Sequence, residues 1–140
     1  MTTPIRTIAV GFDDSPDANA AAKWAVRLAR QIDADVVLVH AIGLRAHLSE
    51  TTIDQELEES SRRLAAEGQL DVAHVSWHVG DGDACSVMLR AIGPPISADL
   101  LVVGSRGQGG HAGLLLGSTS LELAEHANLP LVIVPSERRP

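Results

Sequence analysis

Five short apolar runs, separated by segments with helical spacing, constrain the fold of this chain more than any other feature. The runs are rich in Val, Ile, Leu and Ala and have the length of buried strands. Strands that alternate with helices predict an α/β fold, an open and largely parallel sheet with helices on both faces. The third run alternates apolar and polar residues, which indicates a half-exposed strand at a sheet edge. The five runs are Thr7–Phe12, Asp35–Ala41, Val72–Val79, Asp99–Val103 and Leu131–Val134.

Capping residues predict where the intervening helices begin and end. Ser15 followed by Pro16 favours a helix start just after the first strand. Thr52 and Gln55 have capping-box spacing at the start of a second helix, and Gly68 would end it. Further boundaries are predicted from an N-cap at Asp83, a stop at Gly93-Pro94-Pro95, an N-cap at Ser118 and a helix end at Asn128 and Pro130.

The composition is that of an acidic globular chain. Its 140 residues suffice for one domain, which we expect to span residues 1–140. Eighteen acidic residues against eleven basic ones give a net charge of −7, which argues against binding nucleic acid or anionic lipid. Cys85 is the only cysteine, so no intrachain disulfide exists, and no apolar run approaches the roughly 18 residues of a membrane span. The N-terminus lacks a signal-peptide pattern, so we expect a cytoplasmic location.

The segment between the fourth strand and the last helix carries the chemistry. Six of the twelve glycines lie within Gly104–Gly117, and no acidic residue falls between residues 100 and 121. Glycines let backbone N–H groups approach a phosphate closely, and a helix start adds unpaired N–H donors. The hydroxyls of Ser118 and Thr119 can also donate to phosphate oxygens. These features predict a phosphate or nucleotide site, with a plain flexible loop as the alternative.

Two familiar phosphate-binding motifs are absent from the chain. The P-loop requires Gly-Lys followed by Ser or Thr, whereas the only lysine, Lys23, lies in the first predicted helix. The dinucleotide fingerprint G-x-G-x-x-G does not follow the first strand, where the sequence reads Gly11-Phe12-Asp13-Asp14. Any phosphate site in this chain is therefore built on a different pattern.

The glycines have a long and specific spacing, Gly104-x2-Gly107-x9-Gly117-Ser118. This spacing resembles the ATP-binding signature of the universal stress protein family, in its single-domain, UspA-like type. The opening Val10–Ser15 and the closing His126–Pro130, followed by a Val/Ile strand, are also similar to that family. The resemblance covers the whole chain. It implies a Rossmann-like three-layer sandwich whose five strands have the order 3-2-1-4-5.

The resemblance also implies a nucleotide over the carboxyl ends of strands 1, 2 and 4. Asp13, beside Gly11, would accept a hydrogen bond from a ribose hydroxyl or the adenine amino group, and Ala41 would offer its backbone to the adenine edge. The ligand would be ATP or ADP. A Mg²⁺ or Mn²⁺ ion would bridge its phosphates, but no carboxylate cluster in the sequence forms a metal site made of protein ligands alone. Ribose and phosphates would be wrapped by Gly104, Ser105, Arg106, Gly107, Gln108, Gly109 and Gly110, and the terminal phosphates held by Gly117, Ser118 and Thr119.

Some of these residues have simpler interpretations. Asp13 can instead cap the first helix, and Arg106 can face water rather than a phosphate. Cys85 is expected to be a packed residue, since it lies in a mostly apolar helical segment. Four histidines lack a metal-ligand spacing with Cys85 and are expected to be surface or hydrogen-bonded structural residues: His40, His74, His78 and His126.

The resemblance implies an ATP-binding regulatory protein of the stress response. Its last strand, Leu131–Val134, would be an apolar sheet edge that pairs with a second copy to form a homodimer, and its protein partners are unknown. Two alternatives stay open. One is a nucleotide-free dimeric interaction scaffold. The other is a weak ATPase or phosphotransfer enzyme, in which His111 is the residue to suspect because relatives commonly have a large apolar or aromatic residue there.

Overall fold

The element order alternates strand and helix along the chain, as the apolar runs predict. The computed structural model describes residues 4–42, 50–106 and 117–135. No helix in these ranges is both long and apolar enough to cross a membrane. The elements are β1 (Thr7–Gly11), α1 (Pro16–Ile32), β2 (Asp35–Ile42), α2 (Glu50–Glu67), a short 3₁₀ helix η1 (Val72–His74), β3 (Val75–Asp81), α3 (Ala84–Arg90), β4 (Leu100–Gly104), α4 (Ser118–His126) and β5 (Leu131–Val134).

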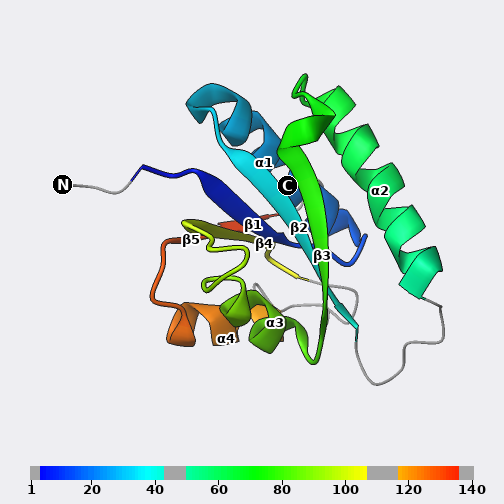
Figure 1. Cartoon of the computed structure of the whole chain (residues 1–140). Coiled ribbons are helices and arrows are strands. Elements are labelled where there is room, and N and C mark those ends of the chain that lie inside the picture. Colours follow the sequence, from blue (N-terminus) through cyan, green and yellow to red (C-terminus); the bar gives the residue numbers. More distant parts are fainter. Residues whose placement is uncertain (1–3, 43–49, 107–116, 136–140) are drawn as a thin grey trace.

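The five strands form one parallel sheet in the order β3-β2-β1-β4-β5, which confirms the predicted order. Helices α1 and α2 cover one face, and α3 and α4 cover the other (Figure 1). The order reverses at β1, since β2 lies on one side of it and β4 on the other. In open sheets of this kind, ligands bind outside the carboxyl ends of the strands at that reversal.

Helix α1 lies close to the sheet because its buried face is made of small residues. Six alanines of this helix are buried, at positions 18, 20, 21, 22, 25 and 29. Alanine both favours a helix and lets the helix backbone approach a neighbouring strand. The approach is closest at β4, where the backbone of Gly104 lies against the backbone of Asp17.

The third strand differs from its predicted bounds. Residues 72–74 form the short η1 helix instead, capped by the Asp71 side chain, which accepts a hydrogen bond from the Ala73 N–H at 2.9 Å. At its other end β3 continues beyond the predicted end at Val79, through Gly80 and Asp81, because these residues stay paired with the end of β2. Its predicted position at a sheet edge is confirmed.

Of the seven predicted helix boundaries, three are confirmed and two are wrong; the other two are approximate, because α3 ends at Arg90, before Gly93, and α4 ends at His126, before Asn128. Ser15 caps α1, Asp83 caps α3, and α2 ends just before Gly68. Helix α2 begins at Glu50, so Thr52 lies inside it rather than at its cap. Ser118 is not the N-cap of α4, because Gly117 already accepts the first helical hydrogen bond, from the Leu121 N–H at 3.1 Å.

Candidate functional site

The carboxyl ends of β1, β2 and β4 lie side by side at one edge of the sheet. Strand β1 pairs with both neighbours, Gly11 with Val39 and Val10 with Val102. Asp13 follows β1 by two residues, Ala41 is the last residue but one of β2, and Ser105 directly follows β4. Three predicted site residues from distant parts of the chain therefore belong to the same end of the sheet. Strand β2 extends one residue beyond its predicted end at Ala41, to Ile42.

Asp13 stabilises the turn between β1 and α1. Its Oδ1 accepts a hydrogen bond from the Ser15 N–H at 3.0 Å, and the Ser15 hydroxyl oxygen in turn accepts one from the Ala18 N–H at 3.2 Å. Ser15 is thus the helix cap, and Asp13 supports the turn before it. Asp14, between them, has a left-handed φ of 60°, a conformation that Asp tolerates better than most residues.

A histidine holds the ends of β1 and β2 together. The Phe12 N–H donates to the Val39 carbonyl at 2.9 Å, and the His40 Nδ1 lies 2.9 Å from the Phe12 carbonyl oxygen. Because a carbonyl only accepts, His40 donates from Nδ1 here. His40 is therefore a hydrogen-bonded structural residue, as expected.

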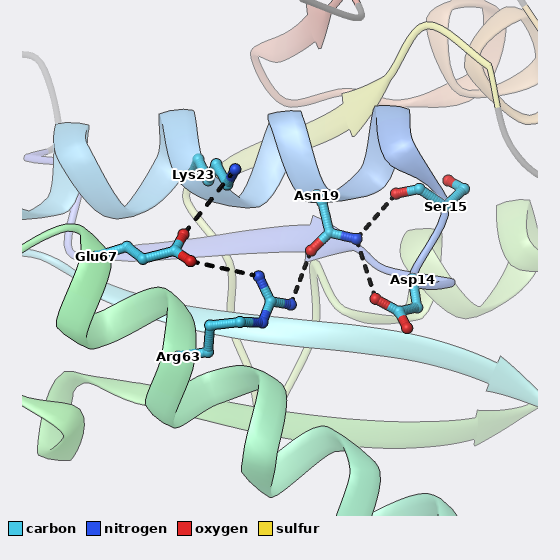
Figure 2. A network of polar contacts seen from close by, with 6 residues as sticks. All are labelled: Asp14, Ser15, Asn19, Lys23, Arg63 and Glu67. Carbon is cyan, nitrogen blue, oxygen red and sulfur yellow. Dashed lines mark hydrogen bonds and ion pairs between the residues drawn. The ribbon is translucent and has the colours of Figure 1, made fainter.

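A network of polar side chains ties this turn to the neighbouring helix (Figure 2). The Asn19 amide donates to the Asp14 carboxylate and to the Ser15 carbonyl, both at 3.0 Å. Arg63 of α2 donates to the Asn19 side-chain oxygen at 2.9 Å, and Glu67 lies 3.9 Å from Arg63. The chain that leaves β1 is thus held to both α1 and α2.

Ser105 joins the two ends of the glycine-rich segment to the rest of the fold. Its carbonyl accepts a hydrogen bond from the Gly117 N–H at 2.6 Å, so the segment begins and ends at neighbouring points. Its N–H donates to the Val134 carbonyl of β5 at 2.9 Å. Its hydroxyl donates to Asp17 Oδ2 at 2.8 Å, and the Arg106 N–H donates to the same oxygen at 2.9 Å. Ser105 is 2% exposed, so all three bonds are shielded from water.

Helix α4 begins beside the Gly117–Ser105 hydrogen bond, and no side chain caps its N-terminus. Its own geometry leaves the N–H groups of Ser118, Thr119 and Ser120 without intrahelical partners. Ser118 is exposed and Thr119 half-buried, whereas the Ser120 hydroxyl donates to the Gly104 carbonyl at 2.8 Å. Exposed first-turn donors and the helix dipole favour an anion at this point. The residues present therefore fit a phosphate group.

Packing inside the protein requires a glycine at position 104 and leaves little room for a side chain at Gly11. A Cβ on Gly104 would lie 2.7 Å from backbone atoms of Asp17, and a Cβ on Gly11 would lie 3.2 Å from the Val103 side chain. Their lack of a side chain is thus explained by neighbouring elements, whereas the sequence suggested phosphate approach. A ligand role for their backbones is compatible with this but is not needed to explain the glycines.

A hollow lies at the carboxyl ends of β2 and β3. It has a volume of about 320 Å³, and none of the thirteen predicted site residues lines it. Trp77 donates from its indole N–H to Asp54 Oδ1 at 3.0 Å, and both residues line this hollow. Its lining residues are Ile42, Asp54, Trp77, His78, Val79 and Asp81.

A sequence model of the universal stress protein family matches residues 4–135. The chain belongs to the universal stress protein family. A curated relative, a universal stress protein of Mycobacterium tuberculosis, is 33% identical over 142 residues, which cover 93% of this chain and 48% of the relative. The chain thus spans about half the length of this relative and of several other curated relatives.

Solved structures of universal stress proteins have the same fold. One, described as a complex with cAMP, has a TM-score of 0.74 and 27% sequence identity, and the match covers 96% of this chain and all of that one. Another, from Arabidopsis thaliana and described with AMP bound, has a TM-score of 0.66 and 19% identity, covering 95% and 93% of the two chains. At that lower identity the second likeness shows the fold alone.

The glycine signature of this universal stress protein is only partly described. Gly104 and Gly117, its first and last glycines, lie beside the hydrogen bond between the Gly117 N–H and the Ser105 carbonyl, and Arg106 directly follows Ser105. Among the residues that the structure describes, no cluster of three or more acidic, histidine or cysteine side chains could hold a metal ion. The remaining predicted residues lie outside the described ones: Gly107, Gln108, Gly109, Gly110 and the suspected His111.

Sequence reasoning missed Asp17. The stretch around the signature contains no acidic residue, yet Asp17 reaches it from α1. Its only sequence signal is its position in the first turn of a capped helix, which fits a favourable interaction with the helix dipole. By contrast, Cys85 is the packed residue expected, with 5% exposure, and burial raises the pKa of its thiol.

Proposed function

We propose that this universal stress protein binds an adenine nucleotide, ATP or ADP, over the carboxyl ends of β1, β2 and β4. The observation that carries the proposal is the closure of the glycine-rich segment by the Gly117–Ser105 hydrogen bond, directly before the first turn of α4, where Ser118 is exposed. Backbone donors at a helix start bind phosphate without any lysine. The cAMP complex of a 27% identical family member supports an adenine nucleotide as the ligand class.

Each part of the nucleotide has an assigned partner in this proposal. Asp13 accepts from the ribose or the adenine amino group, and Ala41 offers its backbone to the adenine edge. The residues from Gly104 to Gly110 surround the ribose and phosphates, and Gly117, Ser118 and Thr119 hold the terminal phosphates. A Mg²⁺ or Mn²⁺ ion would be held chiefly by the phosphate oxygens.

The bound nucleotide acts as a regulatory signal in this proposal rather than as the substrate of an efficient enzyme. ATP bound at residues 104–117 would present a surface that cytoplasmic protein partners read during stress. A nucleotide-free scaffold and a weak ATPase are the competing functions. Replacing His111 with Phe tests the second of these: we expect any slow ATP turnover to be unchanged, and a large loss would favour the enzyme.

Calorimetry with ATP and Mg²⁺ tests the nucleotide site. We expect saturable binding, and we expect Gly117→Val to abolish it by crowding the phosphate path. Gly117 has φ −78° and ψ 169°, which any residue can adopt, so a loss of binding would not reflect backbone strain. Gly93→Ala, where an added Cβ meets nothing closer than 3.8 Å, is the control. Unchanged binding by Gly117→Val would refute the site, and no binding by the parent chain would favour the scaffold.

We further propose that β5 pairs with β5 of a second copy to form a homodimer. All four residues of this edge strand are half-buried. The Pro130 and Val134 carbonyls accept from β4, so alternate residues face β4, and Leu131 and Ile133 direct their backbone groups outward. Ile133→Pro would remove an outward N–H, whereas Ile133→Ala removes the side chain but keeps that N–H. Light scattering should give twice the chain mass for the parent and for Ile133→Ala, and a single mass for Ile133→Pro. A monomeric parent would refute the dimer.

A further inference from the structure

A buried carboxylate lies directly beneath the start of the glycine-rich segment. Asp17 is 9% exposed, and its Oδ2 accepts hydrogen bonds from the Ser105 hydroxyl and the Arg106 N–H. No basic side chain within residues 4–42, 50–106 and 117–135 forms an ion pair with it. Burying a charge without an ionic partner is costly, so its two hydrogen bonds and its place at the start of α1 must compensate.

The two hydrogen-bond donors are the residues through which the segment leaves β4. Ser105 also bonds through its backbone to Val134 and to Gly117, so its position sets both ends of the segment. The Ser120 hydroxyl adds a bond to the Gly104 carbonyl. Loss of Asp17 would leave a buried hydroxyl and a backbone N–H without an acceptor at the one point where the two ends meet.

The charge of Asp17 is unfavourable for a phosphate site, whereas its acceptor oxygen is useful there. A carboxylate near bound phosphates weakens their binding by like-charge repulsion. A single oxygen accepts both hydrogen bonds, so the amide oxygen of an Asn at the same position has the same acceptor capacity without the charge. The acceptor and the charge can therefore be separated by experiment.

We propose that Asp17 is a positioning residue for the nucleotide: it fixes Ser105 and Arg106 so that the phosphate-facing backbone is held ready before the ligand arrives. This inference rests on the proposed nucleotide site. Asp17 acts through its acceptor oxygen, not its charge, and it touches only the residues that line the site. Preorganised donors bind more tightly because less ordering is required on binding.

The test compares the affinity for ATP with that for adenosine, which has no phosphate, by calorimetry. Asp17→Ala should weaken ATP binding by about tenfold or more, the equivalent of one or two lost hydrogen bonds, and leave adenosine binding nearly unchanged. Asp17→Asn should rescue ATP binding to the parent level or better. A general loss of folding would lower both affinities together, so the ratio reports positioning.

Asp99 offers a matched control at the opposite end of β4. A single oxygen of its carboxylate accepts from the N–H groups of Arg6 and Thr7, at 3.0 and 3.1 Å. Asp99→Ala therefore removes two similar hydrogen bonds far from the carboxyl ends of the strands. It should lower stability without changing the ratio of ATP to adenosine affinity.

The outcomes separate this inference from the proposed function. If the parent chain does not bind ATP, the proposed site itself fails. If the parent binds but Asp17→Ala binds ATP as tightly, or if Asp17→Asn is as weak as Asp17→Ala, the positioning role of the acceptor is refuted. Should Asp17→Ala not fold, Ser105→Ala replaces it, since it deletes one of the two hydrogen bonds and keeps the backbone bonds of Ser105. An unchanged affinity ratio in that variant would equally overturn the proposal.

Discussion

The close approach of α1 to β4 predicts that Gly104→Ala destabilises the protein whether or not a nucleotide binds. An added Cβ would lie 2.7 Å from the Asp17 carbonyl carbon, carbonyl oxygen and Cβ. Favourable contacts between carbon atoms lie near 3.5–4.0 Å, so this overlap is strongly repulsive. The backbone atoms of Asp17 cannot rotate away, so either α1 or the end of β4 must shift.

The expected cost is that of overpacking a core, about 1–3 kcal/mol in the free energy of unfolding. Replacing glycine also restricts the unfolded chain, which would return roughly 0.4–1 kcal/mol. The net loss is therefore roughly 0–2.6 kcal/mol, with a midpoint of about 1.3 kcal/mol. For a chain of this size, that midpoint corresponds to a decrease in Tm of roughly 3–5 °C.

Urea denaturation without nucleotide, followed by circular dichroism, measures this loss. Gly93→Ala is the control, because an added Cβ there lies 3.8 Å from its nearest neighbour, the Arg90 carbonyl oxygen. We expect that variant to be as stable as the parent or slightly more so. If Gly104→Ala unfolded at the same urea concentration as Gly93→Ala, the contact between α1 and β4 would not be as tight as the structure indicates.

Two further predictions concern the rest of the fold. Ser15→Ala should lower the free energy of unfolding by about 1 kcal/mol because α1 loses its N-cap, and a urea midpoint equal to that of Ser76→Ala, at an exposed strand position, would contradict this. The hydrogen bond to Asp35, 2.7 Å away, raises the pKa of His74 above its usual 6.5. The pair therefore stabilises the fold fully below pH 6.5, and this stabilisation is lost as the pH rises through the folded-state pKa of His74. The difference in urea midpoint between the parent and His74→Ala should therefore be larger at roughly pH 5.5 than at roughly pH 8.5, and equal differences would exclude this linkage.

Much of the fold could be predicted because its signals are local. The apolar runs mark all five strands, and Ser15 and Asp83 cap the helices that follow them, since a cap acts on an N–H only a few residues away. The errors lie at the boundaries of elements. Thr52 has the right chemistry for a cap but lies within α2, and the end of β3 is extended by its pairing with β2, which no residue in β3 itself reveals.

The candidate site likewise has one part that the sequence predicted and another that only the structure shows. The spacing of Gly104 and Gly117 along the chain identified the segment and its family, because that pattern is read within one stretch of sequence. The hydrogen bond that closes the segment and the shift of the α4 cap to Gly117 depend on where β4 and α4 lie in space.

The sequence by itself determined the fold class and, through family resemblance, the strand order, and it identified the segment in which we propose that a phosphate binds. Only the tertiary structure decided that Asp17 supports that segment, across 88 residues of sequence, and that Gly104 is a glycine because α1 lies against it. The physical reason is the range of the interactions. Periodicity, capping and glycine spacing act between near neighbours in the chain, whereas packing and buried hydrogen bonds act between neighbours in space.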